Sequence, residues 1–301
     1  MGVLPRYRPS LKAQNVRGHL RQNTMKIITF LFILTIIFGC NQTEIKKIIT
    51  KYKNGTPKMV YYFPVKNDTL TYRKEYYYES GKINYTGQIL DGSKSGVWIW
   101  WYENGNRKDK CKYKNGFYVD TVYHWYKNGK IKQLEILSGR KVRTEGCSVC
   151  DGNIIRFFEN GKLKEKFKTL NNKIQGTYLT YEKNGNWKIR TYRNDTLNGP
   201  STEYIKENGK IIKVYGQYKN GNEDGLWKWF NNKNKLYQTA TFEEGFYNGQ
   251  YLKFHPNGKI KEKANLINGE YNGEVFYYNS KGNLIKIENY LKGKIQNSFI
   301  K

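Results

Sequence analysis

The chain contains few of the residues that build most catalytic and metal sites. Its 301 residues include only 4 Cys, 3 His and 6 Pro, and Asp and Glu together number 25. No Ser/His/Asp order, phosphate-binding glycine loop or HExxH zinc motif occurs. The carboxylates are scattered along the chain, and several, such as Glu103, Glu159, Glu182 and Glu207, lie beside or near Asn-Gly pairs, where the solvation of turns explains them. The composition therefore predicts a protein that is not an enzyme and that binds neither a cofactor nor a metal ion.

Long apolar runs are also missing, with one exception near the N-terminus. Residues 27–38 are uncharged and mostly apolar, follow a Lys, and end at Gly39-Cys40. The run is too short to span a bilayer as a helix, but it has the length of the apolar region of a secretory signal. An apolar run closed by a small residue and Cys, with Ile37 three residues before the Cys, resembles the lipobox of bacterial lipoproteins. The resemblance implies that residues 25–39 are a signal peptide and that Cys40 carries the lipid. The alternatives are an uncleaved membrane anchor and a buried apolar strand.

The segments on either side of this signal contain no repeat. Residues 1–24 carry basic residues and no acidic ones, and they are interpreted as an extension from a start codon placed too early or as a basic n-region. Residues 40–50 are expected to act as lipid anchor and tether. The resemblance to lipoproteins implies a protein anchored in the bacterial cell envelope, at the outer membrane, on its periplasmic or surface side.

Aromatic residues, in contrast, are plentiful, with 27 Tyr, 14 Phe and 7 Trp. They fall in short strand-like runs, such as VWIWWY at 97–102, which lead into Asn-Gly or a similar turn signal. The glycine of this signal recurs every 24 to 26 residues, apart from one spacing of 32, and Asn234 occupies the slot in one unit. A fixed period along a chain is the signature of a repeat protein. The glycines predicted to form these turns are Gly55, Gly81, Gly105, Gly129, Gly161, Gly185, Gly209, Gly258 and Gly282.

Each repeat is predicted to be one β-hairpin. The aromatic strand leads into a tight turn at the marker glycine, a basic or polar strand follows, and a looser turn, as at Asn115-Gly116 or Asn198-Gly199, closes the unit. Ordering the backbone of one unit costs roughly 24–48 kcal/mol. Fully burying one ring contributes only about 4–6 kcal/mol, so neighbouring hairpins must stack on one another to be stable.

We therefore expect an all-β fold, an elongated single-sheet meander of about ten stacked hairpins. The repeats should cover residues 51–290, and residues 291–301 should form a C-terminal cap or tail. The rings expected to form the core are Trp98, Tyr102, Tyr126, Phe158, Trp227, Phe230, Phe254 and Tyr278.

These motifs resemble the variant (type 2) MORN repeat. An aromatic residue, Asn-Gly and lysines follow one another in YKNGKIK at 126–132, and Gly-x-Trp opens the strand in GLWKWF at 225–230. The resemblance implies rows of hairpins in one extended sheet, with protein–protein contacts, dimerisation and, in some members, binding to acidic phospholipids. Many bacterial chains of the variant type are called YwqK-like antitoxins. The implied function is that of a non-enzymatic, envelope-anchored scaffold that binds a protein partner. The alternative is an antitoxin or immunity lipoprotein that neutralises a toxin by direct binding.

The period breaks once, where a spacing of 32 residues indicates an insertion at 137–152. The insertion contains Cys147-Ser-Val-Cys150, for which three readings remain open. A disulfide between these two Cys would close a loop in the oxidising envelope. A zinc site would need further ligands, of which Cys111 is one candidate. A redox pair would need a helix N-terminus, which the sequence does not predict here.

Basic residues outnumber acidic ones by 53 to 25, and the formal net charge is +28 at pH 7. Such a surface attracts anions, so anionic lipid, glycan and acidic protein are candidate partners, although the charge can also serve solubility alone. The export signal argues against nucleic acid as a partner, because export separates the protein from it.

Overall fold

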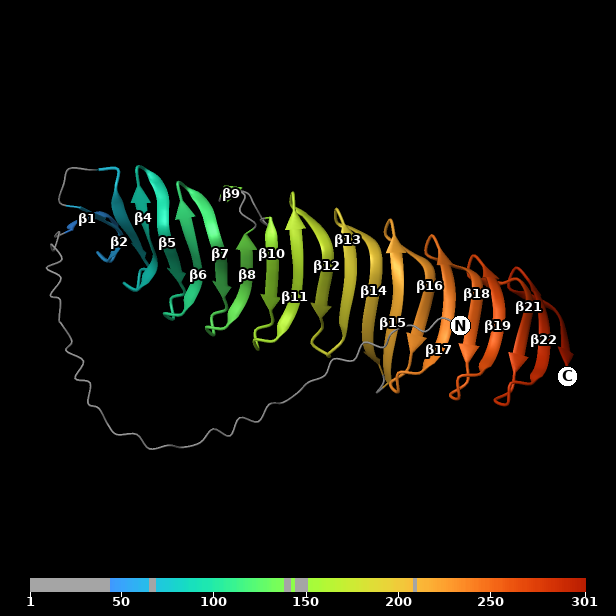
Figure 1. Cartoon of the computed structure of the whole chain (residues 1–301). Helices are drawn as coiled ribbons and strands as arrows, with labels where there is room; N and C mark the ends of the chain where they lie inside the picture. The colour runs from blue at the N-terminus through green and yellow to red at the C-terminus, as the bar shows by residue number, and fades with distance from the viewer. Residues whose placement is uncertain (1–43, 65–68, 138–141, 144–150, 208–209) are drawn as a thin grey trace, which may run out of the picture. The chain divides into compact units, whose positions relative to one another are not determined.

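The computed structural model describes residues 44–64, 69–137, 142–143, 151–207 and 210–301, which all belong to one compact unit, Gln42–Lys301. Within these ranges the chain forms strands and turns and no helix, which confirms the predicted all-β fold (Figure 1). The 23 strands are β1 (Ile45–Lys51), β2 (Pro57–Phe63), β3 (Tyr72–Tyr77), β4 (Ile83–Leu90), β5 (Ser93–Trp101), β6 (Arg107–Lys114), β7 (Phe117–Trp125), β8 (Ile131–Leu137), β9 (Val142–Arg143), β10 (Gly152–Phe157), β11 (Leu163–Leu170), β12 (Lys173–Tyr181), β13 (Trp187–Arg193), β14 (Thr196–Glu207), β15 (Lys210–Lys219), β16 (Asn222–Phe230), β17 (Leu236–Glu243), β18 (Phe246–Phe254), β19 (Ile260–Ile267), β20 (Glu270–Tyr271), β21 (Gly273–Tyr278), β22 (Leu284–Leu291) and β23 (Lys294–Ile300).

The strands form one antiparallel sheet in which nearly every strand pairs with the next one along the chain. β1 pairs with β2 and β2 with β3, and the series continues in chain order to β22 and β23. Short strands interrupt the series at two places. β9 pairs with β7, so that β8 pairs directly with β10, and β20 and β21 both pair with β19. The predicted meander of stacked hairpins is therefore confirmed.

The marker glycines lie in turns of one type. In the turn around Gly105, the backbone N–H of Tyr102 donates to the Asn106 carbonyl at 2.8 Å, and the N–H of Gly105 donates to the Tyr102 carbonyl at 2.9 Å. Gly105 has a φ of 90°, in the left-handed region that favours glycine. The same pair of hydrogen bonds recurs in the turns that contain Gly55, Gly81, Gly129, Gly161, Gly185, Asn234, Gly258 and Gly282.

The tighter turns lie at the other end of the strands, contrary to the prediction. Asn115 (φ 52°) and Gly116 (φ 78°) form a two-residue turn between Lys114 and Phe117, which are paired across β6 and β7. Both φ angles are positive, as in the type I′ turn that matches the natural twist of a hairpin. The marker turns, which span residues 102–106 in the unit above, are the looser ones.

The prediction of a second turn at Asn198-Gly199 is wrong. The turn lies at Asn194 (φ 52°) and Asp195 (φ 68°), and Asn198 and Gly199 lie within β14. Asn and Asp tolerate left-handed backbone better than other residues with a side chain, so they can form this turn without glycine. Gly199 instead allows a close approach to β13, because a Cβ added to it would lie 3.1 Å from Cβ of Thr191.

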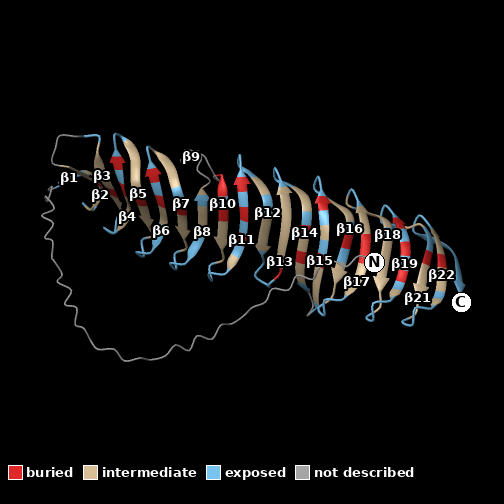
Figure 2. Ribbon diagram, viewed as in Figure 1, coloured by how far each residue is buried: buried red, intermediate tan, exposed pale blue. Residues whose placement is uncertain are grey.

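Alternation of side chains along the strands gives the sheet two different faces, and one of them carries the core. Figure 2 shows buried and exposed residues alternating along strands such as β11 and β19. Trp98 is 2% exposed and Trp227 is 4% exposed. Each indole lies against a glycine of the preceding strand, since an added Cβ would lie 2.0 Å from Trp98 at Gly87 and 2.1 Å from Trp227 at Gly216. A sheet one layer thick thus buries its largest rings in space that glycine leaves open. We call the side of Trp98 and Trp227 the ring face.

The predicted insertion lies between two strands that pair with each other. β8 ends at Leu137 and β10 begins at Gly152, and these two residues are partners in the sheet. The hairpin register therefore continues across the insertion. The segments expected to form the tether and the C-terminal tail each contain a strand, β1 and β23, which pair with β2 and β22.

Four predicted residues fall outside the described residues, namely Cys40, Cys147, Cys150 and Gly209. In the part of the chain that the structure does describe, no helix is long and apolar enough to cross a membrane.

Candidate interaction surface

A row of polar side chains crosses the ring face from strand to strand. Asp109 on β6 pairs with His124 on β7, His124 with Gln133 on β8, Gln133 with Arg156 on β10, and Arg156 with Glu165 on β11. Paired residues of an antiparallel sheet lie on the same face, with Cβ atoms roughly 4.5–5.5 Å apart. The register therefore aligns these side chains, and we call Asp109, His124, Gln133, Arg156 and Glu165 the polar row.

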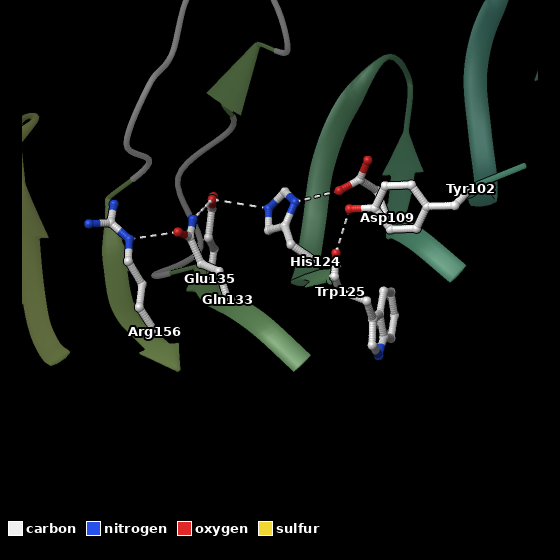
Figure 3. Close-up of polar contacts among 7 residues, drawn as sticks. All are labelled: Tyr102, Asp109, His124, Trp125, Gln133, Glu135 and Arg156. Carbon is white, nitrogen blue, oxygen red and sulfur yellow. Dashed lines mark hydrogen bonds and ion pairs between the residues drawn. The ribbon is translucent and has the colours of Figure 1, made fainter. Parts of the chain in front are cut away.

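His124 lies between two carboxylates (Figure 3). Its Nδ1 lies 2.6 Å from Oδ1 of Asp109, and its Nε2 lies 3.3 Å from Oε1 of Glu135. Burial alone would lower the pKa of His124, but the hydrogen bonds and charges of Asp109 and Glu135 outweigh it and raise the pKa to about 9. The imidazole is therefore protonated at neutral pH and forms ion pairs that join β6, β7 and β8. A group with this pKa stabilises charge and is poorly suited to exchange protons near pH 7.

The polar row continues across the insertion to the next hairpin. Nε of Arg156 donates to Gln133 at 2.6 Å, and its Nη1 donates to Glu165 at 2.9 Å (Figure 3 shows the first of these). The hydroxyl of Tyr178 donates to the other oxygen of Glu165. Burial would raise the pKa of Glu165, but the hydrogen bonds from Tyr178 and Arg156 outweigh it, and the pKa is lowered. The carboxylate is thus held in its charged form.

Buried carboxylates recur in the later repeats, and each has a cation beside it. Glu203, Glu262 and Glu288 are 8%, 6% and 6% exposed. Arg190 donates to Glu203 at 2.5 Å, and Lys253 to Glu262 at 3.2 Å. The other recorded partners of these three carboxylates are Lys188 of Glu203, Tyr271 of Glu262, and Lys286, Tyr277 and Tyr290 of Glu288.

Sequence reasoning placed the carboxylates at turns and missed this buried set. A signal for part of the set is present in the sequence, because an acidic residue lies four positions after several marker glycines. Gly105 is followed in this way by Asp109, and Gly258 by Glu262. An alternating strand that begins at a fixed distance from a turn places this position on the ring face in these units.

The six rings predicted beside the marker turns occupy two positions and are all half-buried. Three of them end the strand before the turn, namely Phe230, Phe254 and Tyr278. The other three begin the turn itself, namely Tyr102, Tyr126 and Phe158. The sequence prediction treated them as one core position. The structure separates them because the later turns have one more residue between the ring and the marker.

A tyrosine that begins a turn ties one repeat to the next. The Tyr102 hydroxyl donates to the carbonyl of Trp125 at 2.8 Å (Figure 3), and Nδ2 of Asn104 donates to the carbonyl of Lys127 at 2.8 Å. Both acceptors lie at the marker turn of the following unit, so we call these turn-to-turn hydrogen bonds the turn ladder. The hydroxyls of Tyr52, Tyr78 and Tyr126 make the same contact at 2.8 Å, with the carbonyls of Tyr77, Trp101 and Phe157.

The opposite face of the sheet carries exposed lysines along a row that contains no acidic residue. A second continuous row of paired residues lies one position along the strands from the polar row. It passes through Lys110, Lys166, Lys228 and Lys263 and contains no acidic residue. Its members from β6 to β19 are Lys110, Tyr123, Leu134, Ile155, Lys166, Leu179, Ile189, Thr202, Tyr215, Lys228, Thr239, Leu252 and Lys263. Lys112, Lys164, Lys168 and Lys261 extend it along β6, β11 and β19. We call these eight lysines the lysine face.

The lysines of this face are exposed, apart from the half-buried Lys110, and none forms an ion pair with a described carboxylate. Apolar side chains lie among them, such as Val97 at 45% and Leu226 at 50% exposed. Successive lysines on one strand lie roughly 7 Å apart, since two strand residues span that length. The face therefore combines lysines that form no ion pair with a described carboxylate and exposed apolar side chains.

The described residues contain no group of three or more His, Cys, Asp and Glu side chains arranged to hold a metal ion. Cys111, which was a candidate zinc ligand, lies on β6 at 3% exposed and is a free thiol. Its burial raises its pKa to about 12, so the thiol is neutral at physiological pH. It packs as an apolar side chain against the ring-face core around Trp98.

Three segments of the chain match the family model of the MORN repeat variant: residues 94–115, 151–172 and 247–268. They coincide with the hairpins β5–β6, β10–β11 and β18–β19. These matches support a MORN-repeat protein, as the motifs indicated.

No curated protein matches the chain. Among solved structures, the chain is similar to alternansucrase in complex with isomaltononaose, with 17% identity and a TM-score of 0.18, over 70% of this chain and 16% of that chain. It is also similar to a chain of the crystal structure of TcdB2-TccC3-Cdc42, with 11% identity and a TM-score of 0.18, over 83% of this chain and 16% of that chain. Global similarity this low supports no conclusion about function.

Proposed function

We propose that this protein, a chain of MORN-variant repeats, is a non-enzymatic binding module whose lysine face docks an acidic surface of a partner protein. The observation that carries the proposal is the row through Lys110, Lys166, Lys228 and Lys263, in which every charged residue is lysine. Unpaired charges of one sign raise the rate of association with a surface of opposite sign and select against like-charged partners.

A protein partner fits this face better than a free small anion. The lysines are spread over strands from β6 to β19, and none of them lines the three pockets found among the described residues. Exposed apolar residues such as Val97 and Leu226 lie on the same face and can pack against a partner. Protein interfaces combine an apolar centre with a polar rim, and this face offers both kinds of surface.

The ring face is less suited to this role because its charges are already paired. Glu165, Glu203 and Glu262 each accept hydrogen bonds from a cation of the same face. Removing one of these cations would leave a buried carboxylate without its partner. The paired charges of the ring face therefore serve stability.

The lipobox resemblance adds a location to the proposal. Lipid on Cys40 would hold the repeats at the envelope and confine the search for a partner to the membrane surface. The scaffold and the antitoxin or immunity protein then differ only in the partner that they bind.

The test is in-cell crosslinking of the tagged full-length protein, followed by mass spectrometry of the captured partners. The test variant replaces Lys164, Lys166 and Lys168 of β11 with Glu. The matched control makes the same change in charge at exposed turn lysines, in Lys127→Glu, Lys233→Glu and Lys281→Glu. We expect the β11 variant to lose an acidic protein partner that the control retains.

Equal loss in both variants, or in neither, would show that the lysine face is not the docking surface. A single captured partner that becomes toxic when this protein is deleted would assign the immunity role instead of the scaffold role. Binding to phosphatidylglycerol vesicles with no protein captured would replace the protein partner by an anionic membrane surface.

A further inference from the structure

The turn ladder is interrupted at Phe158 and recurs at His255 and Asn257, whose side chains contact the carbonyls of Tyr278 and Ser280. Phe158 begins its turn, as Tyr126 does in the unit before, but it has no hydroxyl to donate to the next repeat. The following turn begins with Glu182, whose Oε2 accepts from Nδ2 of Asn184 at 3.2 Å and of Asn186 at 3.1 Å. This turn therefore holds its own side chains together and is joined to β14 by the N–H of Lys206, which donates to Asn186 at 2.7 Å, without a tyrosine.

Two carbonyls at this step lack the side-chain donors that their counterparts have. The Tyr181 carbonyl corresponds to that of Trp125, which accepts from Tyr102, and the Lys183 carbonyl corresponds to that of Lys127, which accepts from an Asn amide. Across the described ranges, no side chain donates to either the Tyr181 or the Lys183 carbonyl. The interruption thus leaves acceptors at the turn edge of the sheet.

An open cavity of about 560 Å³ lies at the same step. Its apolar lining comes from Phe158, Leu163 and Tyr181, of which Tyr181 is 37% exposed. The polar lining consists of Asn160 and Gly185 together with Glu159, Glu182, Lys162 and Lys183. Two carboxylates and two ammonium groups leave the cavity without net charge. A volume of this size is typical of cavities that bind ligands.

We propose that this cavity binds a tyrosine side chain presented by a partner protein. The chain itself shows which groups a carbonyl in this position contacts. Tyr52, Tyr78, Tyr102 and Tyr126 each place a phenol hydroxyl 2.8 Å from it, and one turn, at His255, places an imidazole Nε2 there at 2.8 Å. Phe158 and Tyr181 offer ring surface against which an aromatic side chain packs.

The neutral lining favours a phenol over a charged ligand. An anion would meet Glu159 and Glu182, and a cation would meet Lys162 and Lys183. The site lies at the turn edge of the sheet, and none of the eight lysines of the lysine face lines it, so the inference goes beyond the proposed function and does not depend on it.

The experiment titrates isotope-labelled full-length protein with N-acetyltyrosine amide and follows the backbone amide signals by NMR. We expect shifts confined to residues 158–163 and 181–185. N-acetylphenylalanine amide should bind about 3- to 10-fold more weakly, because it lacks the one hydroxyl that hydrogen-bonds the carbonyl. Equal binding of the two amides, or shifts scattered over the sheet, would overturn the proposal.

Phe158→Tyr supplies the missing hydroxyl from the chain itself. In the geometry of Tyr126 this hydroxyl would reach the Tyr181 carbonyl, and the preference for tyrosine amide over phenylalanine amide should disappear. Phe254→Tyr, which adds a hydroxyl to a ring at the end of β18, is the matched control and should keep the preference. A preference that survives in Phe158→Tyr would also overturn the proposal. The triple Lys→Glu variant of β11 should keep it, which separates this site from the lysine face.

Discussion

The two faces of the sheet use charge in opposite ways, although they share the same strands and the same register. On the ring face, Glu165 is 9% exposed and accepts hydrogen bonds from Arg156 and Tyr178. On the lysine face, the next residue, Lys166, is exposed and has no carboxylate partner among the described residues. Adjacent residues of one strand therefore belong to two different environments.

The two faces differ in charge pairing because charged groups lose water on the ring face and keep it on the lysine face. A charge that loses its water must gain a partner or it destabilises the fold, so the ring face pairs each acid with a base or a hydroxyl. A charge that stays in water needs no partner for folding. Lysines without partners on one side therefore point to binding, and paired charges on the other side point to stability.

The largest test of this contrast compares the two tryptophans of the ring face with their neighbours on the lysine face. Trp98→Ala and Trp227→Ala should each lower the free energy of unfolding by roughly 3–5 kcal/mol, because each ring is buried against a glycine that cannot fill the space. Denaturant titration, with hydrogen exchange of peptides from the same repeats, measures the effect.

Val97→Ala and Leu226→Ala are matched controls one residue away on the exposed side. They should change stability by less than about 1 kcal/mol. If Leu226→Ala destabilised as much as Trp227→Ala, the two faces would not differ in burial. If the tryptophan variants were stable but lost partner binding, the ring face would be the recognition surface.

The second test uses pH to remove one charge from the polar row. The pKa of His124 is raised to about 9, so its ion pairs stabilise the fold fully below the ordinary histidine value of about 6.5 and lose this effect as the pH rises through 9. His124→Gln should therefore be less stable than the wild type by roughly 3 kcal/mol at pH 6, and the difference should shrink toward zero by about pH 10. Denaturation of both proteins over this range gives the difference directly.

His255→Gln is the control for this measurement. The ring of His255 contacts the backbone carbonyl of Tyr278 at 2.8 Å and no described carboxylate. The difference in stability between the wild type and His255→Gln should not shrink between pH 7 and 10 as it does for His124→Gln. A pH-independent difference for His124→Gln would mean that its ion pairs add nothing to stability.

The repeat and its fold could be predicted from sequence because their signals are local. The marker glycines set the period, and Gly-x-Trp runs such as Gly96-Val97-Trp98 place the largest rings on one side of a strand. The type of turn could not be assigned in the same way. Asn-Gly occurs both at Asn104-Gly105 and at Asn115-Gly116, and only the register shows that the second pair forms the two-residue turn.

The polar row also needed the register. Gln133 and Arg156 lie 23 residues apart and on opposite sides of the insertion, so nothing local connects them. Exposed lysines and half-buried arginines such as Arg156 cannot be told apart in an alternating strand until the strand's neighbours are known. For the same reason, the missing hydroxyl of Phe158 has meaning only beside the turn ladder of the other repeats.

The third test removes a single hydrogen bond from the ring face. Tyr178→Phe deletes the hydroxyl that donates to Glu165, and Tyr271→Phe deletes the equivalent donor to Glu262. Each should lower stability by roughly 1.5–3 kcal/mol, since the acceptor is charged. Because the pKa of Glu165 is lowered in the folded state, the Tyr178→Phe effect should be full above the ordinary glutamate value of about 4.3 and fade in stronger acid. Tyr215→Phe, at a tyrosine 40% exposed in the lysine-face row, should be neutral.

The smallest effect is expected where the binding role is proposed. Lys166→Ser should change stability by less than about 0.5 kcal/mol, because the side chain is exposed and unpaired. At low salt Lys166→Ser should be slightly more stable than the wild type, because Lys164, Lys166 and Lys168 repel one another at roughly 7 Å. This gain should vanish at about 1 M salt, where the screening length is near 3 Å. Thermal unfolding of both proteins at the two salt concentrations measures it. A loss above about 1 kcal/mol would show that Lys166 is needed for packing, as its neighbour Glu165 is, and the contrast between the faces would no longer support a docking surface.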